Sequence, residues 1–132
     1  MSSDMKGLDM TMTENSLDQM IDAYITCALW SSVVDEGMPL GDSFTADDLT
    51  PDALARIQDD CRTFYIKTSS RYIFDAETPD QMGHDLWLTR NGHGAGFWDR
   101  GLGEVGERLS DLARSMGEQS LEVGDDGRIW VN

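Results

Sequence analysis

Apolar residues recur at spacings of three and four in several stretches of this sequence, and this spacing constrains the fold more than any other feature. The clearest stretch lies near the C-terminus and contains Leu102, Val105, Leu109, Leu112 and Met116. Such spacing places side chains in one stripe along an α-helix, whereas a half-buried strand needs alternation. It predicts a helix over residues 100–116, with Asp99 as its N-cap and Gly117 at its end.

Two further helices are indicated by their start signals. Thr50 is a suitable N-cap, and Pro51 takes the first helical position, where its missing N–H costs nothing. The segment Thr78-Pro79-Asp80-Gln81 repeats this pattern with a capping-box glutamine. Asn91-Gly92 is typical of a helix end, because both residues tolerate the left-handed conformation. These signals predict helices over residues 51–68 and 79–90.

Another helix is predicted over residues 16–34, where Ser16 and Gln19 form a capping box. Its apolar residues cover a wide stripe, so we expect it to be largely buried. The stripe consists of Leu17, Met20, Ile21, Tyr24, Ile25, Cys27, Ala28, Leu29, Trp30 and Val33. Residues 1–13 are polar and lack periodicity, so we expect them to form a flexible N-terminal arm.

The tail contains two short β-prone runs on either side of Gly124-Asp-Asp-Gly127, which predicts a hairpin over residues 121–131. The predicted fold is therefore α+β and mainly α, with a single globular domain over residues 14–132. We expect the stripe of the last helix, including Leu109, to pack against Ile25, Leu29 and Trp30 of the first.

The chain carries 25 acidic and 10 basic residues, a net charge of −15. Direct binding to nucleic acid or to an anionic membrane is disfavoured, because both depend on Lys and Arg. Three explanations stay open: solubility or salt adaptation, a docking surface for a basic protein, and mimicry of nucleic acid. Asp52, Asp59 and Asp60 lie off the buried stripe of their helix, so they are our candidates for an acidic binding surface.

Cys27 and Cys61 both fall on apolar helix faces, and no CxxC pair occurs. We interpret them as reduced core residues of a cytoplasmic protein. The sequence predicts no metal site and no cofactor. It does not exclude a homo-oligomer.

Residues 83–101 stand out because they contain both histidines and two of the four tryptophans, and their charges sum to zero. One interpretation is structural: the glycines allow a turn, Phe97 enters the core, Trp87 packs from the helix, and Arg90 pairs with Asp85 or Asp99.

The other interpretation is functional. A small-molecule or hydrolytic site would use His84, Asp85, Arg90, His93 and Asp99, with Trp87 or Trp98 as a binding surface. No complete catalytic motif accompanies these residues: the chain has no phosphate loop, no nucleophile elbow and no second upstream histidine for His84-Asp85. We therefore favour a protein that is not an enzyme.

The stretch Gly-His-Asp-Leu-Trp-Leu-Thr-Arg-Asn-Gly-His-Gly-Ala-Gly-Phe-Trp-Asp-Arg-Gly at 83–101 resembles one in small acidic proteins of tailed bacteriophages, prophages and plasmids. Residues 28–32 and 123–127 are similar to that group as well. The resemblance implies a mobile-element origin and the cytoplasm of a bacterial host, and it implies no catalytic residue. Together with the charge, it predicts an accessory protein that occupies a basic surface on a nucleic-acid-binding host or phage enzyme.

Overall fold

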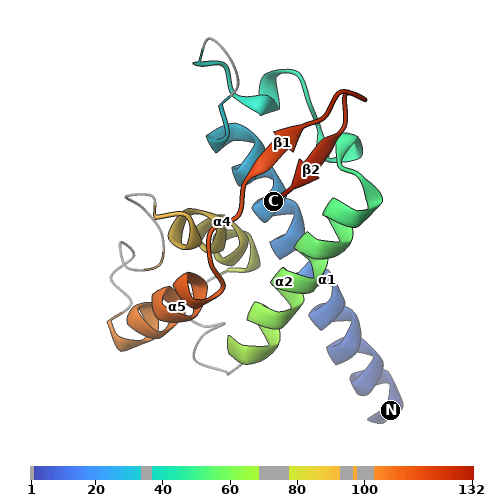
Figure 1. Ribbon diagram of the computed structural model, residues 1–132. Coiled ribbons are helices and arrows are strands. Elements are labelled where there is room, and N and C mark those ends of the chain that lie inside the picture. Colours follow the sequence, from blue (N-terminus) through green and yellow to red (C-terminus); the bar gives the residue numbers. More distant parts are fainter. Residues whose placement is uncertain (1, 34–36, 69–77, 93–96, 98–102) are drawn as a thin grey trace.

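The computed structural model describes residues 2–33, 37–68, 78–92, 97 and 103–132, and the side chains of all of these except 2–15 and 68. Two long helices lead the chain: α1 (Ser2–Ser31) and α2 (Pro51–Thr68), joined through the short 3-10 helices η2 (Leu40–Asp42) and η3 (Ala46–Asp48). Two shorter helices follow, α4 (Pro79–Arg90) and α5 (Glu104–Ser115). The strands β1 (Leu121–Val123) and β2 (Ile129–Val131) close the chain (Figure 1). The mainly α, α+β prediction is confirmed.

The helix starts predicted from local signals are confirmed at α2 and α4, whose bounds match the prediction. The Thr50 hydroxyl accepts from the Ala53 amide at 3.1 Å. Thr78 and Gln81 form the reciprocal capping box, with contacts of 3.2 and 3.4 Å. Gly92 ends α4 in the left-handed region, with a φ of 72°. These contacts lie within a few residues of each other, and this is why the sequence alone predicts them.

The start of α1 was predicted wrongly. The helix begins at Ser2 and not at Ser16, so residues 2–13, which we expected to form a flexible arm, are helical. Ser16 and Gln19 lie inside the helix, so they do not cap it. No proline interrupts residues 2–31, and Met, Leu and Lys favour helices by intrinsic propensity even without an apolar stripe. The helix ends at Ser31, three residues before the predicted end.

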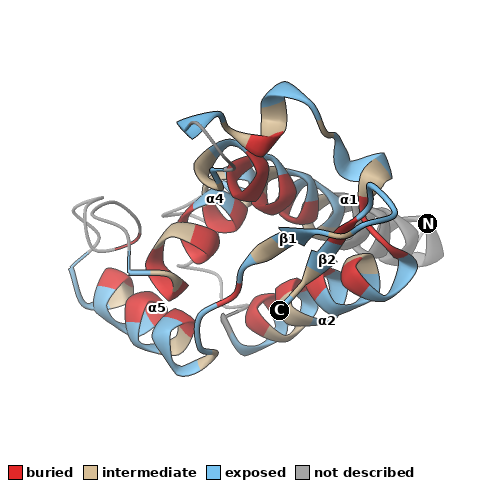
Figure 2. Cartoon of the chain, turned by 45° about the horizontal axis from the view of Figure 1, so that its top comes forward, coloured by how far each residue is buried: buried red, intermediate tan, exposed pale blue. Residues whose placement is uncertain are grey.

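Packing between α1 and α4 forms the main helix contact of the described chain. Gly83 makes it so close that an added Cβ would lie 2.0 Å from the Met20 carbonyl oxygen. Figure 2 shows the buried residues on the inward faces of the helices. Phe97 is fully buried and stacks on Phe64 of α2, with ring centroids 5.5 Å apart. The prediction that Phe97 enters the core is confirmed.

The last helix was predicted to pack on α1, and this part of the prediction is wrong. α5 begins at Glu104 after Gly103, and it packs mainly on α4 and to a smaller extent on α2. Leu109 is buried as expected. Trp30, one of its expected partners, is 54% exposed. The reason is that α4 covers the inward face of α1, so little of that face is left for α5. Leu102 and Asp99 lie outside the described residues.

The hairpin is confirmed: β1 and β2 pair antiparallel, with Leu121 opposite Val131 and Val123 opposite Ile129. It is held on the start of α2, because the Thr50 amide donates to the Ile129 carbonyl at 3.0 Å and the Ile129 side chain is fully buried. Among the described helices, none is long and apolar enough to cross a membrane.

Candidate functional site

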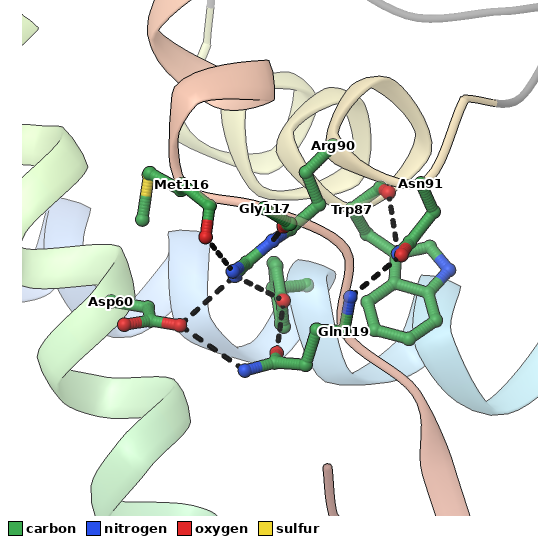
Figure 3. A network of polar contacts seen from close by, with 8 residues as sticks. Asp60, Trp87, Arg90, Asn91, Met116, Gly117 and Gln119 are labelled. Atoms are coloured by element: carbon green, nitrogen blue, oxygen red, sulfur yellow. Dashed lines mark hydrogen bonds and ion pairs between the residues drawn. The ribbon is translucent and has the colours of Figure 1, made fainter.

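Arg90, one of the predicted site residues, is buried in the last turn of α4 and is bonded entirely within the fold (Figure 3). Its side chain is 3% exposed and lies 2.9 Å from a carboxylate oxygen of Asp60 on α2. Nε donates to the Gly117 carbonyl at 2.7 Å, and the terminal nitrogens donate to the Met116 carbonyl at 3.1 Å and the Tyr24 hydroxyl at 3.0 Å. A guanidinium has five N–H donors in a fixed fork. Four contacts of this kind make Arg90 a residue that holds the fold together, and they leave it little capacity to bind a ligand.

Gln119 completes this network from the segment between α5 and β1. It donates to Asp60 at 3.1 Å and accepts a hydrogen bond from the Tyr24 hydroxyl. Its backbone amide donates to Asn91 at 2.8 Å. Burial raises the pKa of Tyr24 above its ordinary value, although Arg90 opposes the shift. The phenol therefore stays protonated and acts as a donor. The network joins α1, α2, α4 and the chain after α5.

Two of the predicted binding residues belong to this interior. Asp60 was expected to be fully solvated, but its side chain is only 24% exposed and pairs with Arg90. Trp87 is 3% exposed, donates to the Ser31 hydroxyl, and meets the Tyr24 ring edge-on with centroids 5.5 Å apart. The expectation that Asp60 is solvated is therefore wrong, because long-range partners from other helices cover both side chains, and a binding role for Asp60 and Trp87 stays a prediction that this burial does not favour. Asp52 and Asp59 are exposed as predicted.

His84 and Asp85 are the two predicted site residues that the structure brings together at a surface. The His84 Nδ1 lies 3.2 Å from an Asp85 carboxylate oxygen; His84 is 48% exposed and Asp85 is fully buried. His93, Trp98 and Asp99 lie outside the described residues, so the remaining part of the predicted site is not placed.

A groove of about 540 Å³ lies beside His84, between α1 and the start of α4. Cys27 lines it, but burial, reinforced by Asp85, raises the pKa of this thiol to about 11. A thiol protonated at neutral pH is a poor nucleophile. No three of the His, Cys, Asp and Glu residues in the described part of the chain are arranged to hold a metal ion. The described residues that line this groove therefore include no thiol that is activated as a nucleophile at neutral pH.

Two further hollows, of about 480 and 390 Å³, lie on the other side of the exposed ridge of α1. They share the lining residues Asp22, Ile25 and Ala46, so they lie next to each other, and we call the two together the α1 groove. One wall is α1, and the other comes from residues 44–47 and from α2. Asp22 also lines the groove beside His84, so it stands on a ridge between the two depressions.

The carboxylates around these depressions form what we call the acidic face. It consists of four exposed residues, Asp18, Asp22, Asp47 and Asp80. The segments that carry them, 16–31, 37–50 and 78–89, contain no Lys and no Arg. By contrast, Asp52, Asp59 and Asp60 of α2 share their helix with Arg56, Arg62 and Lys67, which balance their charge. Among the described residues, the acidic face thus lies on segments without basic residues, whereas α2, where we placed the acidic binding surface, carries as many basic as acidic residues.

The acidic face was missed, although one sequence signal indicates it. No Lys or Arg occurs between Lys6 and Arg56, and Asp18 and Asp22 stand four residues apart, on one side of a helix. The position of residues 44–47 beside α1 depends on tertiary contacts that no local pattern encodes.

A comparison of the chain with protein-family profiles, curated proteins and solved structures finds no match.

Proposed function

We propose that this protein binds a basic surface of a protein partner through its acidic face, and that it acts without catalysis. The observation that carries the proposal is the separation of charge. Four exposed carboxylates from three parts of the chain surround two depressions whose lining includes no Lys or Arg. Complementary potentials of this kind steer association and select partners by the sign of their charge.

The partner that fits this surface best is an enzyme that binds nucleic acid. Such an enzyme presents Lys and Arg to phosphates, and this contact supplies much of its affinity for DNA or RNA. Carboxylates that occupy the same basic surface would displace the nucleic acid and inhibit the enzyme. The resemblance of residues 83–101 to proteins of phages and plasmids supports a role of this kind in a bacterial cytoplasm.

The alternative, a small-molecule or hydrolytic site, has less support among its own residues. Arg90 is bonded within the fold, and the Cys27 thiol beside His84 is held protonated. The His84–Asp85 pair remains as an exposed imidazole next to a buried carboxylate. The described residues therefore favour a binding surface over a reaction centre.

The test is a displacement assay on purified bacterial DNA- and RNA-binding enzymes, each loaded with fluorescently labelled nucleic acid. We expect the chain to release the label from at least one enzyme. A variant with four amides, Asp18→Asn, Asp22→Asn, Asp47→Asn and Asp80→Asn, should lose this effect. All four side chains are exposed, so the variant should keep its fold.

The matched control removes the same charge from other exposed positions. It carries Asp52→Asn, Asp59→Asn, Glu107→Gln and Asp125→Asn. We expect it to displace the label nearly as well as the unmodified chain. Equal loss in both variants would show that only the net charge matters, which would contradict the proposal. The proposal would also be contradicted if the unmodified chain released the labelled nucleic acid from none of the enzymes.

A further inference from the structure

We infer that the α1 groove is a docking site for a short amphipathic helix of the partner, with apolar residues on one side and Lys or Arg along its flanks. The inference rests on the proposed function, because it assigns a form and a position to the basic partner. It is carried by the shape of the groove, its apolar floor and its acidic border.

The length of the groove follows from the residues of α1 that line it. They extend from Asp18 at one end to Trp30 at the other. At 1.5 Å per residue, this stretch of helix measures about 18 Å. A helix of about three turns would match that length. The opposite wall consists of Phe44, residues 45–47 and the α2 residues Leu54 and Gln58.

The floor of the groove is apolar. Ile21, Ile25 and Leu29 follow one another at intervals of four, so they lie along one side of α1. Phe44 and Leu54 are half-buried on the opposite wall. At the end marked by Trp30, the Trp30 ring packs so closely on Gly41 that an added Cβ would lie 2.5 Å from it, and yet Trp30 is 54% exposed. This end therefore offers an aromatic surface to the occupant.

The border of the groove is acidic. Asp18 and Asp22 stand on α1, and Asp47 stands on the opposite wall. All three are exposed, and no Lys or Arg lines either hollow. An apolar floor between acidic borders complements a segment with an apolar stripe flanked by positive charge. A second copy of this chain fits less well, because it carries a net charge of −15 itself.

The backbone of the walls favours a helical occupant over an extended one. An extended peptide gains much of its affinity from main-chain hydrogen bonds to a free sheet edge. Over residues 18–30 the wall is α-helix, whose N–H and C=O groups are already bonded within the helix. A helical occupant satisfies its own backbone and needs only side-chain contacts, as in other helix-in-groove complexes.

The test uses a synthetic 15-residue peptide with Leu at helical spacing and Lys elsewhere, and a scrambled peptide of the same composition. We expect the amphipathic peptide to bind at least about tenfold more tightly than the scrambled one and to gain helical circular dichroism on binding. The variant Ala46→Trp places a large side chain where the two hollows meet, and Ala46 is exposed. It should weaken binding of the amphipathic peptide at least about tenfold.

The matched control is Ala55→Trp, at an exposed position on α2 that lines neither hollow. It should bind the amphipathic peptide like the unmodified chain. If both peptides bind equally and Ala46→Trp has no effect, the groove inference is overturned while the acidic face can still bind basic partners. A dimer of the chain that Ala46→Trp dissociates would overturn it too, because the groove would then hold a second copy. Failure of the displacement assay, by contrast, would count against the proposed function itself.

Discussion

Arg90 illustrates at the level of single residues why the prominent segment 83–101 was difficult to interpret from sequence. The nearby carboxylates Asp85 and Asp99 were its expected partners, whereas its carboxylate partner in the structure is Asp60, thirty residues earlier in the chain. A buried guanidinium requires a charged partner and several acceptors. Only the tertiary arrangement that brings Asp60 of α2 to the end of α4 decides which carboxylate serves. The described part of the segment therefore supports the structural interpretation.

The first prediction follows from this network. Arg90→Met should destabilise the protein by roughly 2–4 kcal/mol, because it removes the charged partner of Asp60, which keeps only the Gln119 amide among the described residues, and leaves two backbone carbonyls without their donor. The loss should fall short of that for a fully buried pair, since Asp60 keeps some contact with water. Urea unfolding measures it. The control, Arg56→Gln at an exposed site of α2, should change the free energy by less than about 0.5 kcal/mol. A similar small change at Arg90 would contradict the structural role.

The second prediction concerns the two buried thiols. Burial raises the pKa of Cys27 to about 11 and that of Cys61 to about 12, from an ordinary value near 9. Above pH 9 the unfolded chain therefore releases these protons while the folded chain keeps them. The unfolded state is favoured, and stability should fall as the pH rises from 9 to 10.

Thermal melting at pH 8, 9 and 10 measures this effect, and the double variant Cys27→Ala, Cys61→Ala should show a shallower decline than the unmodified chain. At pH 8 both thiols should also resist alkylation by iodoacetamide until the protein is unfolded, because the thiolate is the reactive form. Rapid alkylation of the folded protein would contradict the assigned burial.

At the scale of whole elements, the accuracy of the sequence prediction depends on how local the determining contacts are. The bounds of α2 and α4 follow from caps that act within one turn, so they were predicted correctly. The start of α1 was placed too late, because Ser16 and Gln19 match the capping-box pattern but lie inside the helix. The short helices η2 and η3 were not predicted, because neither is long enough to show apolar periodicity, and the Gly and Pro residues beside η2 are typical of a loop.

The third prediction concerns the contact between α1 and α4. Gly83→Ala should destabilise the protein by about 1–3 kcal/mol, because the new methyl group would meet the Met20 carbonyl. Intrinsic helix propensity acts in the opposite direction, since Ala is favoured over Gly by about 1 kcal/mol. The clash must exceed this gain, so the sign of the change is diagnostic. Differential scanning calorimetry measures it, and a variant more stable than the parent would show that the two helices are not in close contact at Gly83.

For the whole molecule, the sequence established the amount of negative charge but not its location. The chain has an excess of 15 acidic residues wherever they lie. Asp52 and Asp59 were chosen because they are solvated on their own helix, a criterion that ignores neighbouring Lys and Arg. The acidic face arises because α1, residues 44–47 and the start of α4 come together. Its formation depends on tertiary structure, which a reading of single helices does not predict.

The last prediction uses salt to separate the two parts of the binding surface. Exposed charges are screened beyond about 10 Å at 0.1 M salt, so the affinity for the amphipathic basic peptide should fall at least about tenfold between 50 and 500 mM NaCl. The Asn variant of the acidic face should bind more weakly at 50 mM and respond less to salt. The control with amides at Asp52, Asp59, Glu107 and Asp125 should keep nearly the full salt response.

The apolar part of the binding should behave differently. Apolar burial is not weakened by NaCl, so the binding that remains at 500 mM should still be lost in Ala46→Trp. Isothermal titration calorimetry over this range measures both components, and a salt response that is the same in all variants would show that the acidic face has no special part in binding.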